Sequence, residues 1–183
     1  MARLFRLALF LAAVVLATGL SACGGDDDSA GSKPETAASQ PDTGTAAEPT
    51  PAEAEEALKD TSQKPVIPKP TGSPPRRLVV EDIVKGKGKA AKKGDTVIVN
   101  YVGMNFSNGQ EFDASWDRGQ PFPVQLGTGG VIQGWEQGLI GIRQGGRRKL
   151  TIPPELGYGP QGQPPAIPPN ETLIFVVDAV SVG

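Results

Sequence analysis

The chain has no histidine and a single cysteine, Cys23, in its 183 residues. These two shortages exclude a histidine-based zinc site, a disulfide framework, and any catalytic pairing of serine or cysteine with histidine. Chemistry in this protein must therefore come from carboxylates, hydroxyls, backbone groups or the shape of an apolar pocket. We expect neither a metal nor a cofactor.

Aromatic residues are missing from residues 24–75, which also hold half of the chain's prolines. The same stretch carries ten acidic residues against four lysines. Such a composition cannot bury enough apolar surface to offset the entropy lost on ordering, so it predicts a disordered linker. A helical turn over residues 52–58 is the one local element that the pattern suggests.

Long apolar runs are also scarce, and the one at residues 7–20 is too short for a comfortable membrane span. Two arginines precede it and small residues follow it, as in a secretory signal. Residues 20–23, Leu-Ser-Ala-Cys, resemble the bacterial lipobox, in which the cysteine is lipidated and becomes the new N-terminus. An ordinary signal peptide with an incidental cysteine is the alternative.

The signal-like N-terminus, the polar middle segment and the C-terminal segment rich in strand patterns predict three regions along the chain. A lipoprotein signal peptide covers residues 1–22, and residues 23–75 form the lipidated N-terminus and the linker. Residues 76–183 form the folded domain. Lipid on Cys23 would hold the protein to a bilayer without spanning it. We therefore expect the extracytoplasmic face of the bacterial cell membrane as its location.

Charge in residues 76–183 is nearly balanced, with ten acidic against twelve basic residues. The lysines of residues 85–93 are interleaved with glycines and lack stacking aromatics, so they indicate a solvated loop. Without a basic stripe, we expect no nucleic-acid partner.

Strand patterns dominate residues 76–183. Alternation of apolar and polar residues predicts strands at 96–101 and 147–152, and a longer apolar run predicts one at 172–180. Residues 78–84 and 122–126 are shorter candidates. Between the strands expected at 122–126 and 147–152, a helical spacing joins Val131, Trp135 and Leu139, where glycines at 134, 138 and 141 keep the helix short. The class is α+β, an antiparallel sheet with one short helix packed on a face.

Five motifs stand in order through this domain: Tyr101-Val102-Gly103, Gly109-x-x-Phe112-Asp113, Val131-Ile132-x-Gly134-Trp135, Leu156-Gly157-Tyr158-Gly159 and Ile167-Pro168-Pro169-Asn170-x-Thr172-Leu173-x-Phe175. Their spacing closely resembles that of the FKBP-type peptidyl-prolyl cis/trans isomerases, the macrolide-binding immunophilins. The resemblance covers about residues 76–183. It implies a twisted antiparallel sheet wrapped around one short helix, with an apolar cleft between them.

The resemblance also implies a set of site residues. Trp135 would form the floor of the cleft, and Phe112, Asp113 and Tyr158 would complete the catalytic group. Tyr158 would donate its hydroxyl to a substrate carbonyl, and the backbone N–H of Ile132 would be a second donor. The substrate-binding walls would be Tyr101, Phe122, Val131, Ile132, Ile167 and Phe175.

Simpler readings exist for several of these residues. Aromatic side chains in a small domain are commonly core, and Val131, Phe122 or Phe175 alone would fit that role. Asp113 alone could cap a helix or turn. Arg118 could pair with Asp113 or lie exposed in solvent.

The implied reaction is rotation about an X-Pro peptide bond, whose uncatalysed barrier is about 18–20 kcal/mol. No covalent bond breaks, so the lack of a histidine or a metal is compatible with it. Expected partners are proline-containing exported polypeptides, with macrolide inhibitors as further ligands, and we expect a monomer. The alternatives are a proline-peptide-binding module or holdase with little turnover, and a structural envelope lipoprotein that reuses the fold.

Overall fold

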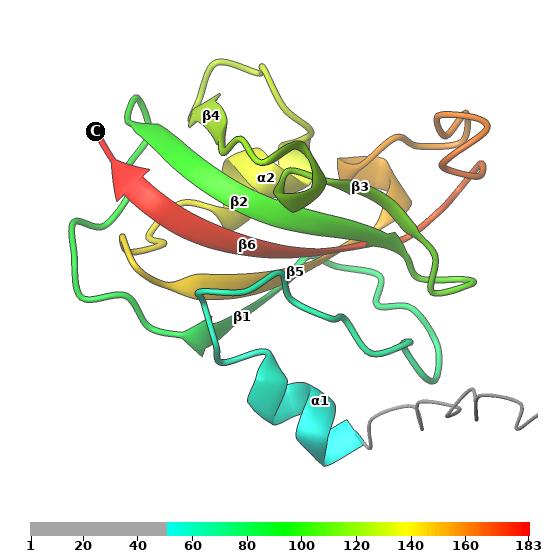
Figure 1. The fold of residues 1–183 in the computed structure, drawn as a ribbon. Coiled ribbons are helices and arrows are strands. Elements are labelled where there is room, and N and C mark those ends of the chain that lie inside the picture. Colours follow the sequence, from blue (N-terminus) through cyan, green and yellow to red (C-terminus); the bar gives the residue numbers. More distant parts are fainter. Residues whose placement is uncertain (1–50) are drawn as a thin grey trace, which may run out of the picture. The chain divides into compact units, whose positions relative to one another are not determined.

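The computed structural model describes residues 51–183 (Figure 1). The signal peptide expected at residues 1–22, the lipidation site Cys23 and the first half of the linker lie outside the described residues. Within residues 51–183, no helix has both the length and the apolar character needed to cross a bilayer.

Six antiparallel strands form one sheet, in the spatial order β1-β5-β6-β2-β3, with β4 also paired to β2. Their bounds are β1 Val79–Val84, β2 Thr96–Asn105, β3 Glu111–Ala114, β4 Phe122–Gln125, β5 Arg147–Ile152 and β6 Leu173–Val182. The two long strands, β2 and β6, pair along most of their length and form the centre of the sheet. All five predicted strands are present, and β3 is an addition.

One face of the sheet, which we call the front face, packs against the short helix α2, Gln133–Gly138 (Figure 1). The alternation predicted for the strands places their apolar residues on this side. Val97 and Val99 of β2, and Leu150 of β5, are completely buried there. This cluster forms the main core, and it supports the α+β fold.

Two glycines of α2 allow the helix to lie very close to β5. A Cβ atom on Gly138 would lie 2.7 Å from the side chain of Leu150, and one on Gly134 would overlap Ile152. The sequence predicted that these glycines shorten the helix. The structure adds that they let its backbone approach the sheet.

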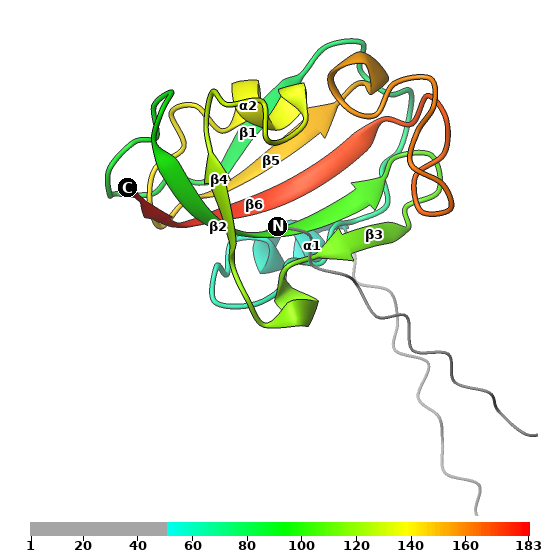
Figure 2. The same cartoon turned by 90° about the horizontal axis from the view of Figure 1, so that it is seen from above.

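The back face of the sheet is covered by the helix α1, Pro51–Ala57, and by residues 58–67, which we call the strap. Figure 1 shows α1 and α2 on opposite sides of the sheet, and Figure 2 shows α1 behind β2. Ala54 and Leu58 are buried, at 3% and 5% exposure. Composition predicted disorder over the whole linker, and in the structure residues 51–67 of it form α1 and the strap.

Apolar residues on the back face explain why this part of the linker is ordered. Val102 and Met104 of β2 pair with Val176 and Ile174 of β6, and all four are buried although they point away from α2. Residues 64–67 of the strap line a cavity on this face together with Val102 and Met104. A few apolar residues in the linker are sufficient because the sheet supplies the remaining apolar surface.

Arg147 of β5 connects the sheet to the strap through a fully buried guanidinium. Its Nη1 donates to the carbonyls of Leu58 and Asp60 at 3.0 and 2.9 Å, and its Nη2 donates to that of Gln63 at 2.9 Å. The remaining donors bind Asp178 of β6, so all five N–H groups are used. Burial raises the pKa of Asp178, and the hydrogen bond from Arg147 opposes that shift.

Three connections carry side chains to the end of the sheet where β3 and η2 lie. A turn at residues 107–109 joins β2 to β3, where Gly109 adopts a φ of +73° that favours glycine. After β3, the short 3-10 helix η1, Trp116–Arg118, ends at Gly119 in the left-handed region. A second 3-10 helix, η2, Pro154–Leu156, follows β5 and leads to Tyr158.

Candidate active site

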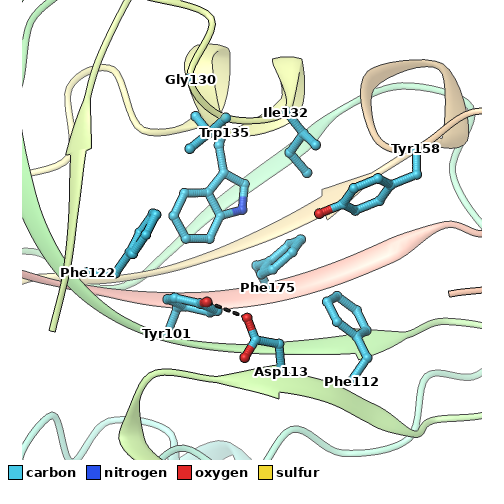
Figure 3. A pocket seen from close by; sticks show the side chains of 10 residues that line it. Tyr101, Phe112, Asp113, Phe122, Gly130, Ile132, Trp135, Tyr158 and Phe175 are labelled. Carbon is cyan, nitrogen blue, oxygen red and sulfur yellow. Dashed lines mark hydrogen bonds between the residues drawn. The ribbon is translucent and has the colours of Figure 1, made fainter. Parts of the chain in front are cut away.

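Trp135 forms the floor of a cleft between α2 and the front face of the sheet (Figure 3). Its ring meets Tyr101 edge-on at a centroid distance of 5.1 Å and Phe175 at 5.2 Å. Phe112 in turn packs edge-on against Phe175 at 5.5 Å. These arrangements are the favoured ones for aromatic pairs, so they fix the indole in one orientation.

The cleft has a volume of about 430 Å³ and is open to solvent on one side. Its lining comes from four strands, α2, the loop before α2 and the loop after η2: Tyr101, Phe112, Asp113, Phe122, Gly130, Val131, Ile132, Trp135, Tyr158 and Phe175. The structure therefore brings together nine of the ten residues that the sequence proposed for catalysis and substrate binding. Trp135 is 4% exposed, and the space above it is not filled by the protein's own side chains.

Ile167 is the predicted residue that does not line this cleft. It is buried, and it lines an adjoining cavity of about 370 Å³ together with residues 163–166. Phe112, Asp113 and Tyr158 line both spaces. The loop of Ile167 therefore flanks the cleft without forming its wall.

Asp113 belongs to a closed network of three side chains. The Tyr101 hydroxyl donates to one carboxylate oxygen of Asp113, and Arg118 donates to the other. Arg118 also donates to the Tyr101 hydroxyl at 2.8 Å, and its guanidinium carbon lies 5.7 Å from the centre of the Tyr101 ring. The carboxylate therefore caps no helix or turn, and the pairing with Arg118 considered from the sequence is present.

Room for two of the aromatic walls depends on Gly103 of β2. A Cβ atom at this position would lie 2.7 Å from ring atoms of both Phe112 and Phe175. The glycine in the motif Tyr101-Val102-Gly103 thus has a packing reason, because any side chain would displace these rings from the cleft.

Tyr158 points its hydroxyl into the cleft from the side opposite Phe122 (Figure 3). Burial, and secondarily the charge of Asp113, raise the pKa of Tyr158 above its ordinary value of 10.0. Burial and the hydrogen bond to Asp113 raise the pKa of Tyr101 in the same direction. Both hydroxyls are therefore protonated at neutral pH. Within residues 51–183 the Tyr158 hydroxyl has no hydrogen-bond partner, so it is available as a donor.

Glu136 of α2 orders the loop that precedes the helix, a role that the sequence did not suggest. Its carboxylate accepts hydrogen bonds from the backbone N–H groups of Gly127 and Gly129, the latter at 2.8 Å. This fixes the loop that continues into Val131 and Ile132. The sequence signal that could have revealed this role was an acidic residue in the first helical turn, preceded by a glycine-rich loop.

The part of the chain that the structure describes contains no group of three or more acidic, cysteine or histidine side chains arranged to hold a metal ion. The polar groups that face the cleft are a carboxylate, two phenols and backbone amides. Such a site can bind and desolvate a neutral group, and it can donate hydrogen bonds to a carbonyl oxygen.

Comparison with known proteins defines the class. Residues 87–180 match the model of the FKBP-type peptidyl-prolyl cis-trans isomerase family. An FK506-binding protein of Streptomyces anulatus is 53% identical over 121 residues, which cover 66% of this chain and 98% of that protein. The FKBP-type isomerase FkpA of Escherichia coli is 50% identical over 105 residues, 57% of this chain and 37% of the relative.

Solved structures agree with the sequence relatives. The crystal structure of AtFKBP13 superimposes with a TM-score of 0.54 at 38% identity, covering 58% of this chain and 93% of that one. The structure of FkpA from Escherichia coli gives a TM-score of 0.52 at 50% identity, covering 57% and 47%. The chain belongs to the FKBP-type peptidyl-prolyl cis/trans isomerases. It is an enzyme of that type, as the motifs predicted.

Proposed function

We propose that this isomerase acts on X-Pro bonds of exported polypeptides while it is attached to the outer surface of the cell membrane through lipid on Cys23. The observation that carries the catalytic part is the open, aromatic cleft floored by a buried Trp135, with an unpartnered Tyr158 hydroxyl at its mouth. The anchoring part rests on the sequence pattern alone.

Desolvation is the main source of the rate gain in this proposal. Amide resonance places partial negative charge on the carbonyl oxygen of the planar bond, and water stabilises that charge. The twisted bond is less polar, so a cleft lined by aromatic rings favours the transition state over the ground state. Lowering the barrier by about 4–6 kcal/mol would accelerate the reaction about 10³- to 10⁴-fold.

Binding of the proline ring is assigned to the floor and walls. The ring would lie on Trp135, between Phe175 and Val131, where burial of its methylenes supplies affinity. The Tyr158 hydroxyl and the Ile132 N–H would donate to substrate carbonyls on either side of the proline. Among the described residues the Ile132 N–H has no other acceptor, as a donor to substrate requires.

Asp113 acts in this proposal mainly through its charge and its hold on Tyr101. Both of its oxygens already accept hydrogen bonds from Tyr101 and Arg118. Its carboxylate is therefore held in place by these two side chains. Its negative charge beside the cleft repels the partially negative carbonyl oxygen of the planar X-Pro bond. The charge therefore destabilises the ground state relative to the twisted transition state.

Macrolide binding is proposed for the same cleft. Several relatives are named FK506-binding proteins, and the cleft is large enough and apolar enough to hold part of a macrolide. A macrolide in this position would exclude peptide and act as a competitive inhibitor.

Refolding of a protein limited by a slow X-Pro step tests the catalytic proposal. The full chain should accelerate that step, and an FK506-type macrolide should abolish the acceleration. A Trp135→Leu variant should lose most of the gain while remaining folded by circular dichroism. If the full chain suppresses aggregation and leaves the isomerisation rate unchanged, the protein is a holdase and the proposal is wrong.

The anchor is tested separately in cells. A fatty-acid analogue should label the wild-type chain, and the chain should sediment with membranes. Cys23→Ser should abolish the label and release the protein, whereas Ser21→Ala, which leaves the cysteine in place, should not. Label in the Cys23→Ser variant would refute the proposed attachment site.

A further inference from the structure

Lys64 of the strap contacts the segment that carries the polar side of the active site. Its Nζ lies 2.7 Å from Oε1 of Glu111 and 2.7 Å from Oδ1 of Asp117. Glu111 is the first residue of β3, two positions before Asp113. Asp117 is in η1, immediately before Arg118. The two carboxylates that Lys64 joins are therefore close in the sequence to Asp113 and Arg118, which form the ion pair beside the cleft.

Without Lys64, Asp117 would lose its cation and would compete with Asp113 for the neighbouring Arg118. The hydrogen bond from Lys64 holds the pKa of Asp117 below its ordinary value, and the charge of Arg118 contributes a smaller lowering. Arg118 is thus already within electrostatic reach of Asp117. The ion pair that it makes with Asp113 is partly exposed, so a modest change in local charge could redirect it.

The strap itself is fixed independently of Lys64. Buried Arg147 binds the carbonyls of Leu58, Asp60 and Gln63, and Leu58 and Pro65 are buried. Lys64 lies between these fixed points, so its ammonium is delivered to the same place by the backbone around it. Its own ion pairs are partly exposed, with Lys64 at 36% and Asp117 at 58%, and contribute little to global stability.

We propose that Lys64 is a positioning residue of the active site: it neutralises Glu111 and Asp117, and so keeps Arg118 on Asp113 and Tyr101. The docked strap thereby becomes part of the catalytic apparatus, although it lies on the face of the sheet opposite the cleft. The inference rests on isomerase activity in the cleft and is independent of the lipid anchor.

Substitution of Lys64 by Met in the full chain tests this. We expect kcat to fall about three- to tenfold, the size of one lost positioned hydrogen bond, with KM nearly unchanged because the apolar walls are intact. The urea midpoint should stay within error of wild type. Lys64→Arg should restore kcat. The matched control is Lys59→Met, since Lys59 belongs to the same strap and pairs with Glu56.

A suppressor variant separates positioning from general damage. If Lys64 acts by neutralising the two carboxylates, then Glu111→Gln and Asp117→Asn added to Lys64→Met should restore most of the lost activity. Wild-type activity in Lys64→Met would overturn the proposal, as would a loss that neither the arginine nor the suppressor variant corrects. If wild type itself is inactive, the isomerase assignment fails first, and the two failures are distinguishable.

Discussion

The front and back faces of the sheet use the same strands for different purposes. On the front, aromatic side chains leave a hollow of about 430 Å³ above Trp135. On the back, β2, β5 and β6 are covered by α1 and the strap, and the cover is held by a buried arginine. One face is kept open for a substrate, and the other is closed by the chain's own N-terminal segment.

This difference shows how the two faces of one sheet can serve two different functions. Alternate residues of β2 serve opposite faces, so Tyr101 faces the cleft while its neighbour Val102 is buried beneath the strap. A change in the cleft should therefore alter activity without much loss of stability, and a change in the buried contacts of the back face should do the reverse; Lys64 of the strap is the proposed exception. Four predictions test that separation.

The largest expected effect is on the back face. Arg147→Met leaves Asp178 buried without its cation and three strap carbonyls without a donor, so we expect a loss of about 3–5 kcal/mol in the free energy of unfolding. Urea denaturation measures it. Arg143→Met, which removes an exposed guanidinium bound to the Gly88 carbonyl, is the control and should cost little. Equal losses in the two variants would contradict the assigned role.

Leu58→Ala should have the second largest effect. Leu58 is 5% exposed, and its truncation leaves a cavity between strap and sheet that should cost about 2–3 kcal/mol. Activity of the folded fraction should stay close to wild type. Val66→Ala, at a strap position that is 63% exposed, should change the thermal midpoint hardly at all. A disordered strap would make the two variants equivalent.

On the front face, Tyr158→Phe removes one hydroxyl and leaves the ring. Because no residue within 51–183 accepts its hydrogen bond, stability should not change. The value of kcat/KM should fall about two- to tenfold, the effect of one net hydrogen bond to substrate. A protease-coupled assay measures the rate. A loss of stability without a loss of rate would assign Tyr158 to packing instead.

The smallest effect is expected from pH. Burial raises the pKa of Tyr158, so its hydroxyl stays protonated and able to donate from about pH 6 to about pH 9, where kcat/KM should be flat. A decline should begin only above about pH 10, as the phenol ionises. Tyr158→Phe should lack this component of the decline, with folding followed in parallel by circular dichroism. A bell-shaped profile centred near neutrality would contradict the proposed chemistry.

Most of the front face could be predicted from the sequence. The alternation in residues 96–101 placed Val97, Val99 and Tyr101 on one buried face, and all three are buried there. The helical spacing of Trp135 located α2. These signals are local, because a half-buried strand and an amphipathic helix show their periods within a few residues.

The strand β3 and the packing of Ile167 could not be predicted in the same way. Glu111–Ala114 has only four residues, too few for their polar and apolar alternation to stand out, and it becomes a strand because β2 offers it an edge. Ile167 belongs to the motif that marks the cleft, yet it supports a neighbouring cavity. In both cases the outcome depends on partners that are distant in the sequence.

By itself, the sequence determined the α+β class, the family and nine of the ten cleft residues, because these depend on local periodicity and on motifs in fixed order. Only the tertiary structure decided whether residues 51–75 take a defined structure. Their composition is too polar to fold alone, but the apolar back face of β2 and β6 and the buried guanidinium of Arg147 supply what the segment lacks. The structure of that segment depends on its contacts with the sheet. The composition of the segment alone contains no information about those contacts.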